Sequence, residues 1–323
     1  MTDIQRRTFI FISFFIAITF IGFIQSWNVA LGIFNLCIIS AIMALGVNIQ
    51  LGYAGIFNAG VMGFAALGGL AAVIISYPPV PETIELGGSG IILSLIILTV
   101  GSAIVTIIYK SNLTSIIKKI TIPLTILILI ILFNFVGSPA IESIEAFKPA
   151  ASGFLGGFGL PIVLSWFVGG ILAGIVAFFI GKLTLGLRSD YLAIATLGIA
   201  EVIIYFLKNE DWLTRGVKNV NGLPRPVPYE VDLQGNTWFI EFCERYNFPL
   251  VETSSIIVKI SYCLLFSGVL ITLFVLSEIA LKSPWGRMMR AIRDNEVSAR
   301  AMGKNVKARH LEIFIIGSAI VGL

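Results

Sequence analysis

The sequence predicts an all-α fold: a polytopic integral membrane bundle that crosses a bilayer about nine times. Hydrophobic residues make up 57% of the 323 positions and charged residues only 12%, whereas an average soluble domain carries about 25% charged residues. Apolar runs of about 20 residues recur along the chain, the length that crosses a hydrocarbon core as a helix. Lipid offers the backbone no hydrogen-bond partner, so these runs are helices rather than open strands.

The apolar runs form one predicted transmembrane domain, residues 1–323. The first run shows no evident cleavage site and is interpreted as a retained span. The last run stops at Leu323, too soon to cross, so we expect either a truncated ninth span or a sequence that is a fragment. The predicted spans are residues 8–26, 29–50, 53–76, 90–109, 120–138, 161–181, 190–207 and 255–281, and one that starts at 311.

Basic residues set the predicted orientation. With the N-terminus in the cytoplasm, most of the 22 lysines and arginines fall on the cytoplasmic side, as the positive-inside rule requires. The basic run 282–310 then forms a cytoplasmic loop. The longest polar segment, 208–254, lies outside, where it is either a small folded cap or a disordered loop.

Composition and motifs argue against several function classes. The net charge of +4 does not indicate nucleic-acid binding, because the basic residues lie between apolar runs. Cys37, Cys243 and Cys263 lack the spacing of a metal site or disulfide framework. No P-loop motif is present, and no catalytic constellation can be assembled. We therefore expect a chain that is not an enzyme and binds no metal or cofactor.

The segment 48–69 is rich in glycine. As one helix it would place Gly55, Ala59 and Gly63 on a face that lets helices approach closely. The glycines also permit a break in the helix, and broken helices often line substrate paths, so the segment serves either packing alone or packing together with pathway lining. In the segment 187–206, Glu201 is the only carboxylate well inside a predicted span, either a pathway contact or a structural hydrogen bond. The candidate pathway or packing residues are Asn48, Tyr53, Gly55, Asn58, Gly60, Gly63, Thr196 and Glu201.

The segment 283–304 has the pattern of one short amphipathic helix. Ser283 is a suitable N-cap, Pro284 a suitable first residue and Gly303 a suitable stop. Its expected apolar face is Met288, Ala291, Ile292, Asn295, Ala299 and Met302. A basic amphipathic helix can lie on anionic membrane lipid or dock in a groove of a soluble partner.

Three strings resemble the permeases of branched-chain amino-acid ABC importers: GYAGIFNAGVMGFAALGG, YLAIATLGIAEVI and GRMMRAIRDNEVSARAMGKNVKARHLEIFIIGSAIVGL. The resemblance covers roughly residues 30 to 323. It implies a permease subunit in a bacterial or archaeal plasma membrane. The implied partners are a second related permease, two cytosolic ATPase subunits that hold the ATP and Mg²⁺, and an external solute-binding protein. The run 282–310 becomes a coupling loop whose implied ATPase-docking residues are Gly286, Arg287, Arg290, Ala291, Arg293, Asn295, Glu296, Ala299 and Gly303.

The sequence also departs from that family's pattern. Ile56, Asn58 and Val61 stand where the family often shows Gln, Ser and His or Gln, and Arg215 interrupts a Gly- and Asn-bearing outer stretch. Similar folds import urea, short amides or sugars, so the alternative is an importer permease for urea, amides or another small polar solute. A stand-alone secondary carrier or channel is a further alternative, although few intramembrane charges support it.

Overall fold

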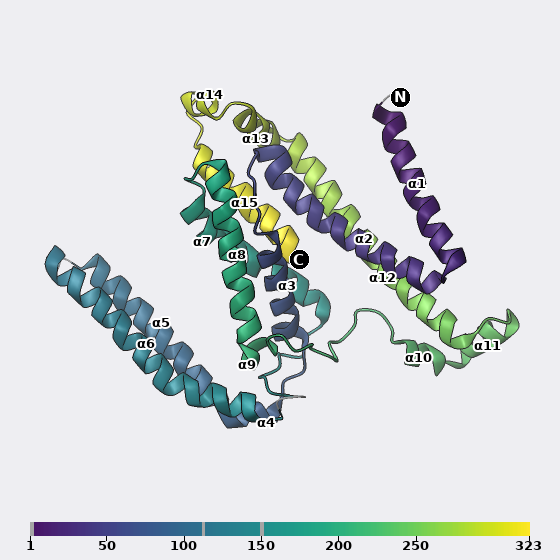
Figure 1. Ribbon diagram of the computed structural model, residues 1–323, viewed down its shortest axis with the longest axis horizontal. Coiled ribbons are helices and arrows are strands. Elements are labelled where there is room, and N and C mark those ends of the chain that lie inside the picture. The colour runs from purple at the N-terminus through teal and green to yellow at the C-terminus, as the bar shows by residue number, and fades with distance from the viewer. Residues whose placement is uncertain (1–2, 112–113, 149–151) are drawn as a thin grey trace. The chain divides into compact units, whose positions relative to one another are not determined.

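The computed structural model describes residues 3–111, 114–148 and 152–323 (Figure 1). Long apolar runs make most of the described residues helical. The helices are α1 Asp3–Ile24, α2 Trp27–Asn48, η1 Ile49–Tyr53, α3 Val61–Ser76, α4 Pro81–Thr83, η2 Ile84–Gly88, α5 Ser89–Lys110, α6 Ser115–Ala146, α7 Ile162–Thr184, α8 Ser189–Asn209, α9 Asp211–Thr214, α10 Glu230–Gln234, α11 Thr237–Arg245, α12 Leu250–Lys282, α13 Pro284–Asp294, α14 Glu296–Ala301 and α15 Val306–Gly322.

The prediction of a polytopic helical membrane protein is confirmed. Across the described ranges, seven helices are long and apolar enough to cross a membrane, rather than about nine. The other two predicted spans correspond to α3, with 16 residues, and α15, with 17. A helix rises 1.5 Å per residue, so each is shorter than a hydrocarbon core of about 30 Å. The side of the membrane on which the N-terminus lies remains a prediction.

The chain divides into two compact units, Met1–Gly68 with Trp166–Glu201 and Arg225–Leu323, and Gly69–Ser165 with Val202–Pro224. In the first unit, α2 lies alongside α12 (Figure 1) and also packs against α1 and α15. Polar side chains join α2 to α12: Asn35 Nδ2 donates to the Lys259 carbonyl at 3.0 Å, and Lys259 Nζ to the Asn28 carbonyl at 2.8 Å.

In the second unit, α5 and α6 form a closely packed hairpin. Small residues permit this approach, because a Cβ on Gly90 would lie 2.5 Å from the Ala140 Cβ, and one on Gly137 would lie 3.1 Å from Ser94 Oγ. Ala140 and Ile144 are buried with Ile91. The predicted span 120–138 is part of a longer helix, because α6 extends beyond it at both ends.

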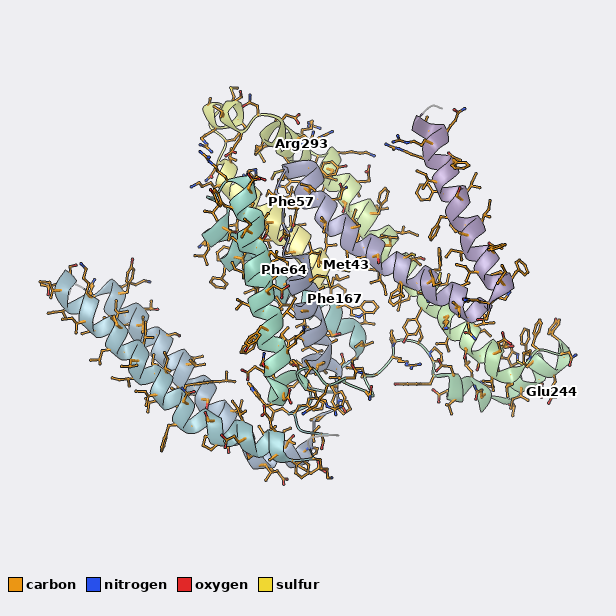
Figure 2. The ribbon with its side chains drawn as sticks, viewed as in Figure 1. Met43, Phe57, Phe64, Phe167, Glu244 and Arg293 are labelled. Carbon is orange, nitrogen blue, oxygen red and sulfur yellow. The ribbon has the colours of Figure 1, made fainter. Side chains whose placement is uncertain are left out.

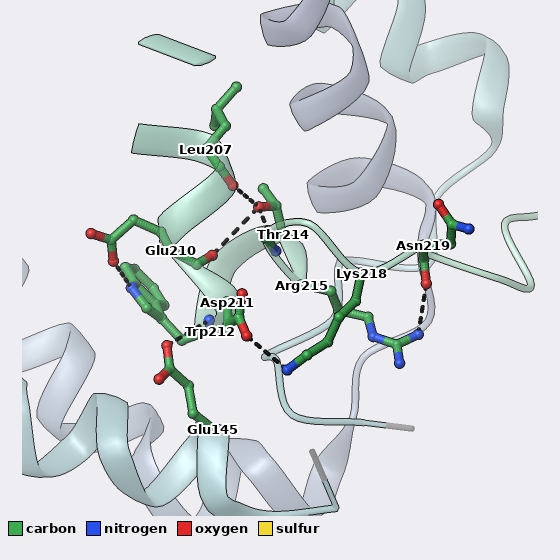
Figure 3. A network of polar contacts seen from close by, with 10 residues as sticks. Glu145, Leu207, Glu210, Asp211, Trp212, Thr214, Arg215, Lys218 and Asn219 are labelled. Atoms are coloured by element: carbon green, nitrogen blue, oxygen red, sulfur yellow. Dashed lines mark hydrogen bonds and ion pairs between the residues drawn. The ribbon is translucent and has the colours of Figure 1, made fainter. Parts of the chain in front are cut away.

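The polar segment 208–254 contains three short helices, α9, α10 and α11, and is divided between the two units. Figure 3 shows the polar network of its first part. Lys218 pairs with Asp211 at 2.7 Å, and the Arg215 guanidinium donates to the Asn219 carbonyl at 2.9 Å. The Trp212 backbone N–H donates to Glu145 at 3.2 Å and so fastens this turn to α6. In the second part, Gln234 of α10 bonds Ser254 of α12.

Candidate functional site

The glycine-rich segment is a broken helix. Helix α2 continues directly into η1, a π-helical turn, and the helical path ends beyond Tyr53. Gly55 has φ +71°, a conformation that favours glycine, and α3 begins only at Val61. The prediction that Gly55, Ala59 and Gly63 share one helix face is therefore wrong, because residues 55–60 are not helical. The structure contains the break that the glycines permit, and pathway lining by this segment stays a prediction.

Neighbouring groups satisfy much of the backbone of the helix break, residues 54–60. The Gly55 and Ile56 N–H groups donate back to η1, to the carbonyls of Leu51 and Gln50. The Ala59 N–H donates to Thr196 Oγ1 at 3.1 Å, and the Gly60 N–H to Asn58 Oδ1 at 2.9 Å. Non-helical backbone at membrane depth is tolerated where protein groups replace water in this way.

A buried amide network holds the break against α15. The Gln50 side chain is 1% exposed, and its Nε2 donates to the Phe314 carbonyl at 2.9 Å and to Ser318 Oγ at 3.0 Å. Its Oε1 accepts from Asn58 Nδ2 at 3.0 Å. Buried polar groups are costly unless bonded, so this network favours one arrangement of the break and α15.

The structure brings together four of the predicted pathway residues: Asn58, Gly60, Gly63 and Thr196. A Cβ on Gly60 would collide with the Thr196 backbone, and one on Gly63 would lie 2.8 Å from the Ala200 Cβ. These glycines therefore serve the close approach of the break and the first half of α8. Whether the four also line a path remains a prediction.

The other four predicted pathway residues lie outside this cluster. Asn48 and Glu201 are exposed in the chain, and Tyr53 is half-buried. Gly55 faces a different neighbour, since its Cβ would lie 3.2 Å from Arg293 Cγ on α13. The Glu201 side chain is therefore not buried within the compact unit to which it belongs.

The loop between α12 and α15 contains two helices rather than the single one predicted over 283–304. The chain breaks at Asn295, whose φ of −155° and ψ of 96° are extended. Its side chain accepts from the Ser298 N–H at 2.9 Å and caps α14. Gly303 ends α14 as predicted, with φ +76°. Its N–H bonds the Arg300 carbonyl while the Lys304 N–H bonds that of Ala299, the Schellman pattern.

The packed face of α13 also differs from the prediction. Met289, Ile292 and Gly286 are buried, whereas Met302, expected on the apolar face, is 80% exposed. The break at Asn295 accounts for the exposure of Met302, because it ends α13 before that residue. Ser283 precedes α13 as predicted, but its hydroxyl donates to the Ala280 carbonyl at 2.6 Å instead of capping α13.

Side chains fix α13 between the two helices that flank the loop. The Arg287 guanidinium donates to the Lys282 carbonyl at 3.1 Å, where α12 ends, a favourable position for a cation. On the other side, Trp285 Nε1 donates to Glu312 of α15 at 3.2 Å, and Arg309 contacts both oxygens of that carboxylate at 2.7 Å. The predicted docking residues Arg290, Ala291, Glu296 and Ala299 remain at least partly accessible.

A known protein family matches the part of the chain that contains this loop. The family model described as branched-chain amino acid transport system, permease component, matches residues 140–323, which include α12, the loop and α15. The chain belongs to this permease family. The resemblance seen in the sequence is thereby confirmed.

Two curated relatives of this permease are similar over a shorter range. The chain is 25% identical over 128 residues to the high-affinity branched-chain amino acid transport system permease protein LivM of Salmonella typhimurium. It is 27% identical over 131 residues to LivM of Escherichia coli. Each match covers 39% of this chain and 29% of the relative's length. No solved structure gives a significant match.

Sequence reasoning missed the partners of the break. Gln50 carried a usable signal, since an amide in an apolar run must find a bond within the protein. Phe314 takes part through its backbone, and Ser318 is one of many serines in spans, so neither carried a local signal. The same holds for Gly46 and Gly317, which come from distant segments to make one close crossing.

Proposed function

We propose that this permease is the membrane subunit of an ATP-binding-cassette importer for branched-chain amino acids. The observation that carries the proposal is the family match over residues 140–323, which contains both the broken-helix partner α15 and the loop α13–α14. Both similar relatives are high-affinity branched-chain amino acid permeases by name. The proposed setting is the bacterial inner membrane.

The broken helix is the proposed lining of the translocation path. Broken helices at membrane depth commonly form substrate sites, because they present backbone groups that an intact helix would consume. Here Asn58 and Thr196 hold the break from two directions, while Phe57 and Met62 remain exposed. Apolar side chains beside backbone polar groups suit an amino acid with an aliphatic side chain.

The loop α13–α14 is the proposed docking site for cytosolic ATPase subunits. It is short, basic and held in place by Arg287 and Trp285, while its second helix is exposed. A rigid amphipathic helix that presents an accessible face fits a groove on a soluble protein. ATP and Mg²⁺ would then bind to the partner subunits, and a second permease and an external binding protein would complete the importer.

Purification from native membranes in mild detergent, followed by reconstitution, tests the proposal. We expect an ATPase and a second permease to copurify, and the vesicles to accumulate labelled leucine, isoleucine or valine only with ATP and binding protein. Uptake by the purified chain alone, without ATP, would show a secondary carrier or channel instead. ATP-dependent uptake of urea or amides in preference to leucine would support an ATP-binding-cassette importer but contradict branched-chain amino acids as its solutes.

A further inference from the structure

The carbonyl groups at the end of η1 need partners, because the helix stops there. Gly55 and Ile56 donate their N–H groups to Leu51 and Gln50, and these two bonds leave the Gly52 carbonyl at the helix terminus. Arg293 Nη1 of α13 donates to the Gly52 carbonyl at 2.6 Å, from a position 241 residues away in the sequence. A guanidinium at a helix C-terminus is favoured both by charge-assisted hydrogen bonding and by the helix dipole.

The same side chain also covers the first residue of the break. A Cβ on Gly55 would lie 3.2 Å from Arg293 Cγ and 4.0 Å from Arg293 Cβ. Figure 2 shows Arg293 at this end of the segment, with Phe57 and Phe64 following along the chain into α3. Arg293 also pairs with Asp294 at 2.9 Å, and its side chain is 40% exposed. The loop helix thus contacts the break itself.

We propose that Arg293 is a positioning residue that ties the loop helix α13 to the helix break, so that movement of α13 moves the segment 54–60. This inference rests on the proposed function and identifies where force from an ATPase enters the path. The other attachments of the break support such a hinge: Gln50 holds one side of it to α15, while Gly55, at φ +71°, is the residue at which the chain turns.

Cross-linking tests the contact without any ATPase. In a chain with Cys37, Cys243 and Cys263 replaced by alanine, the pair G55C/R293C has its Cβ atoms 4.0 Å apart, within the range that disulfides span. We expect oxidation in membranes to join this pair and to leave the control pair G55C/R287C, six residues earlier on α13, unjoined. Absence of the first cross-link, or equal yield from both pairs, would overturn the proposal.

Coupling measurements test the consequence. In the reconstituted importer we expect R293A to keep ATP hydrolysis while transport per ATP falls about tenfold, the weight of one charge-assisted hydrogen bond. R293K retains a donor and should recover part of the loss. The control is K110A, which removes an exposed cation at the end of α5, outside the loop and the break. A disulfide between positions 55 and 293 replaces the tie, so the oxidised G55C/R293C importer should transport more solute per ATP than the same importer after reduction. Unchanged transport per ATP in R293A, or equal transport per ATP by the oxidised and reduced G55C/R293C importer, would overturn the inference but leave the importer proposal intact.

A cysteine at position 55 could itself disturb the chain, so variants that keep Gly55 are also measured. A side chain at φ +71° is strained, so G55C is also assayed singly, and R293A and R293K keep Gly55 itself. Failure of the wild-type importer to transport any amino acid with ATP would instead contradict the proposed function. The two failures are therefore distinguishable.

Discussion

Gly46 and Gly317 face each other where α2 crosses α15, with no room for a side chain on either. A Cβ on Gly46 would lie 2.7 Å from the Gly317 carbonyl oxygen, and a Cβ on Gly317 would lie 2.6 Å from that of Gly46. The neighbour in each case is backbone, which yields only if the helices separate. The same crossing positions Gln50, two residues into η1, to reach Phe314 and Ser318.

We therefore expect Gly46→Ala or Gly317→Ala to lower stability by about 1–3 kcal/mol, the usual cost of overpacking. The measurement is the midpoint of thermal unfolding of the detergent-solubilised chain. Gly268→Ala on α12 is the matched control, since a Cβ there meets nothing within 4 Å. It should leave the midpoint unchanged or raise it slightly, because alanine favours helix. A midpoint for Gly317→Ala equal to that of Gly268→Ala would contradict this packing.

Replacing Gln50 by leucine should release the break from α15. The substitution removes the acceptor of Asn58 Nδ2 and the donor to the Phe314 carbonyl. A double-mutant cycle with Asn58→Leu should give a coupling free energy of about 0.6–1.7 kcal/mol, the range of hydrogen bonds between membrane helices. Asn48→Leu is the control, because Asn48 is exposed. Additive effects of the two substitutions would argue against the bond.

Thr196→Val should destabilise the join between α8 and the break, because valine keeps the shape but leaves the Ala59 N–H without its acceptor. A buried donor that loses its partner costs about 1–3 kcal/mol. Thr196→Ser retains the hydroxyl and should behave like the wild type. The readout is hydrogen exchange of the Ala59 amide, which should quicken in the valine variant alone. Equal exchange in both variants would refute the assignment.

Glu296→Arg should reduce ATP-dependent uptake while the chain still inserts into membranes. Glu296 pairs with Arg300 at 2.5 Å on the accessible helix α14. An exposed i,i+4 pair contributes only about 0.3–0.5 kcal/mol to stability, so loss of uptake would report the docking surface. The charge-swapped double variant Glu296→Arg/Arg300→Glu separates the two causes. Full recovery of uptake in the double variant would mean that uptake depends on the ion pair within α14, and not on a contact between Glu296 and the ATPase.

Local residue types were sufficient to predict a helical membrane protein and the ends of several helices. Long apolar runs force membrane helices because lipid bonds no backbone group, and the seven long spans follow from that alone. Pro284 begins α13 and Gly303 ends α14 as expected, since each residue's φ preference acts within a few positions. The glycine content of 48–69 indicated that a break was possible.

The tertiary structure decided where the break occurs and what holds it. Periodicity treats a run of small and apolar residues as one helix, and nothing local distinguishes Gly55 from Gly60 or Gly63. The choice depends on partners far away in sequence: Phe314 and Ser318 for Gln50, Thr196 for Ala59, and Arg293 for Gly52. A helix can stop in the membrane only where other protein groups form hydrogen bonds with its freed backbone N–H and C=O groups. Composition and motifs therefore predict a helical permease with a basic loop, whereas the contact between this loop and the break depends on packing between residues that are far apart in the chain.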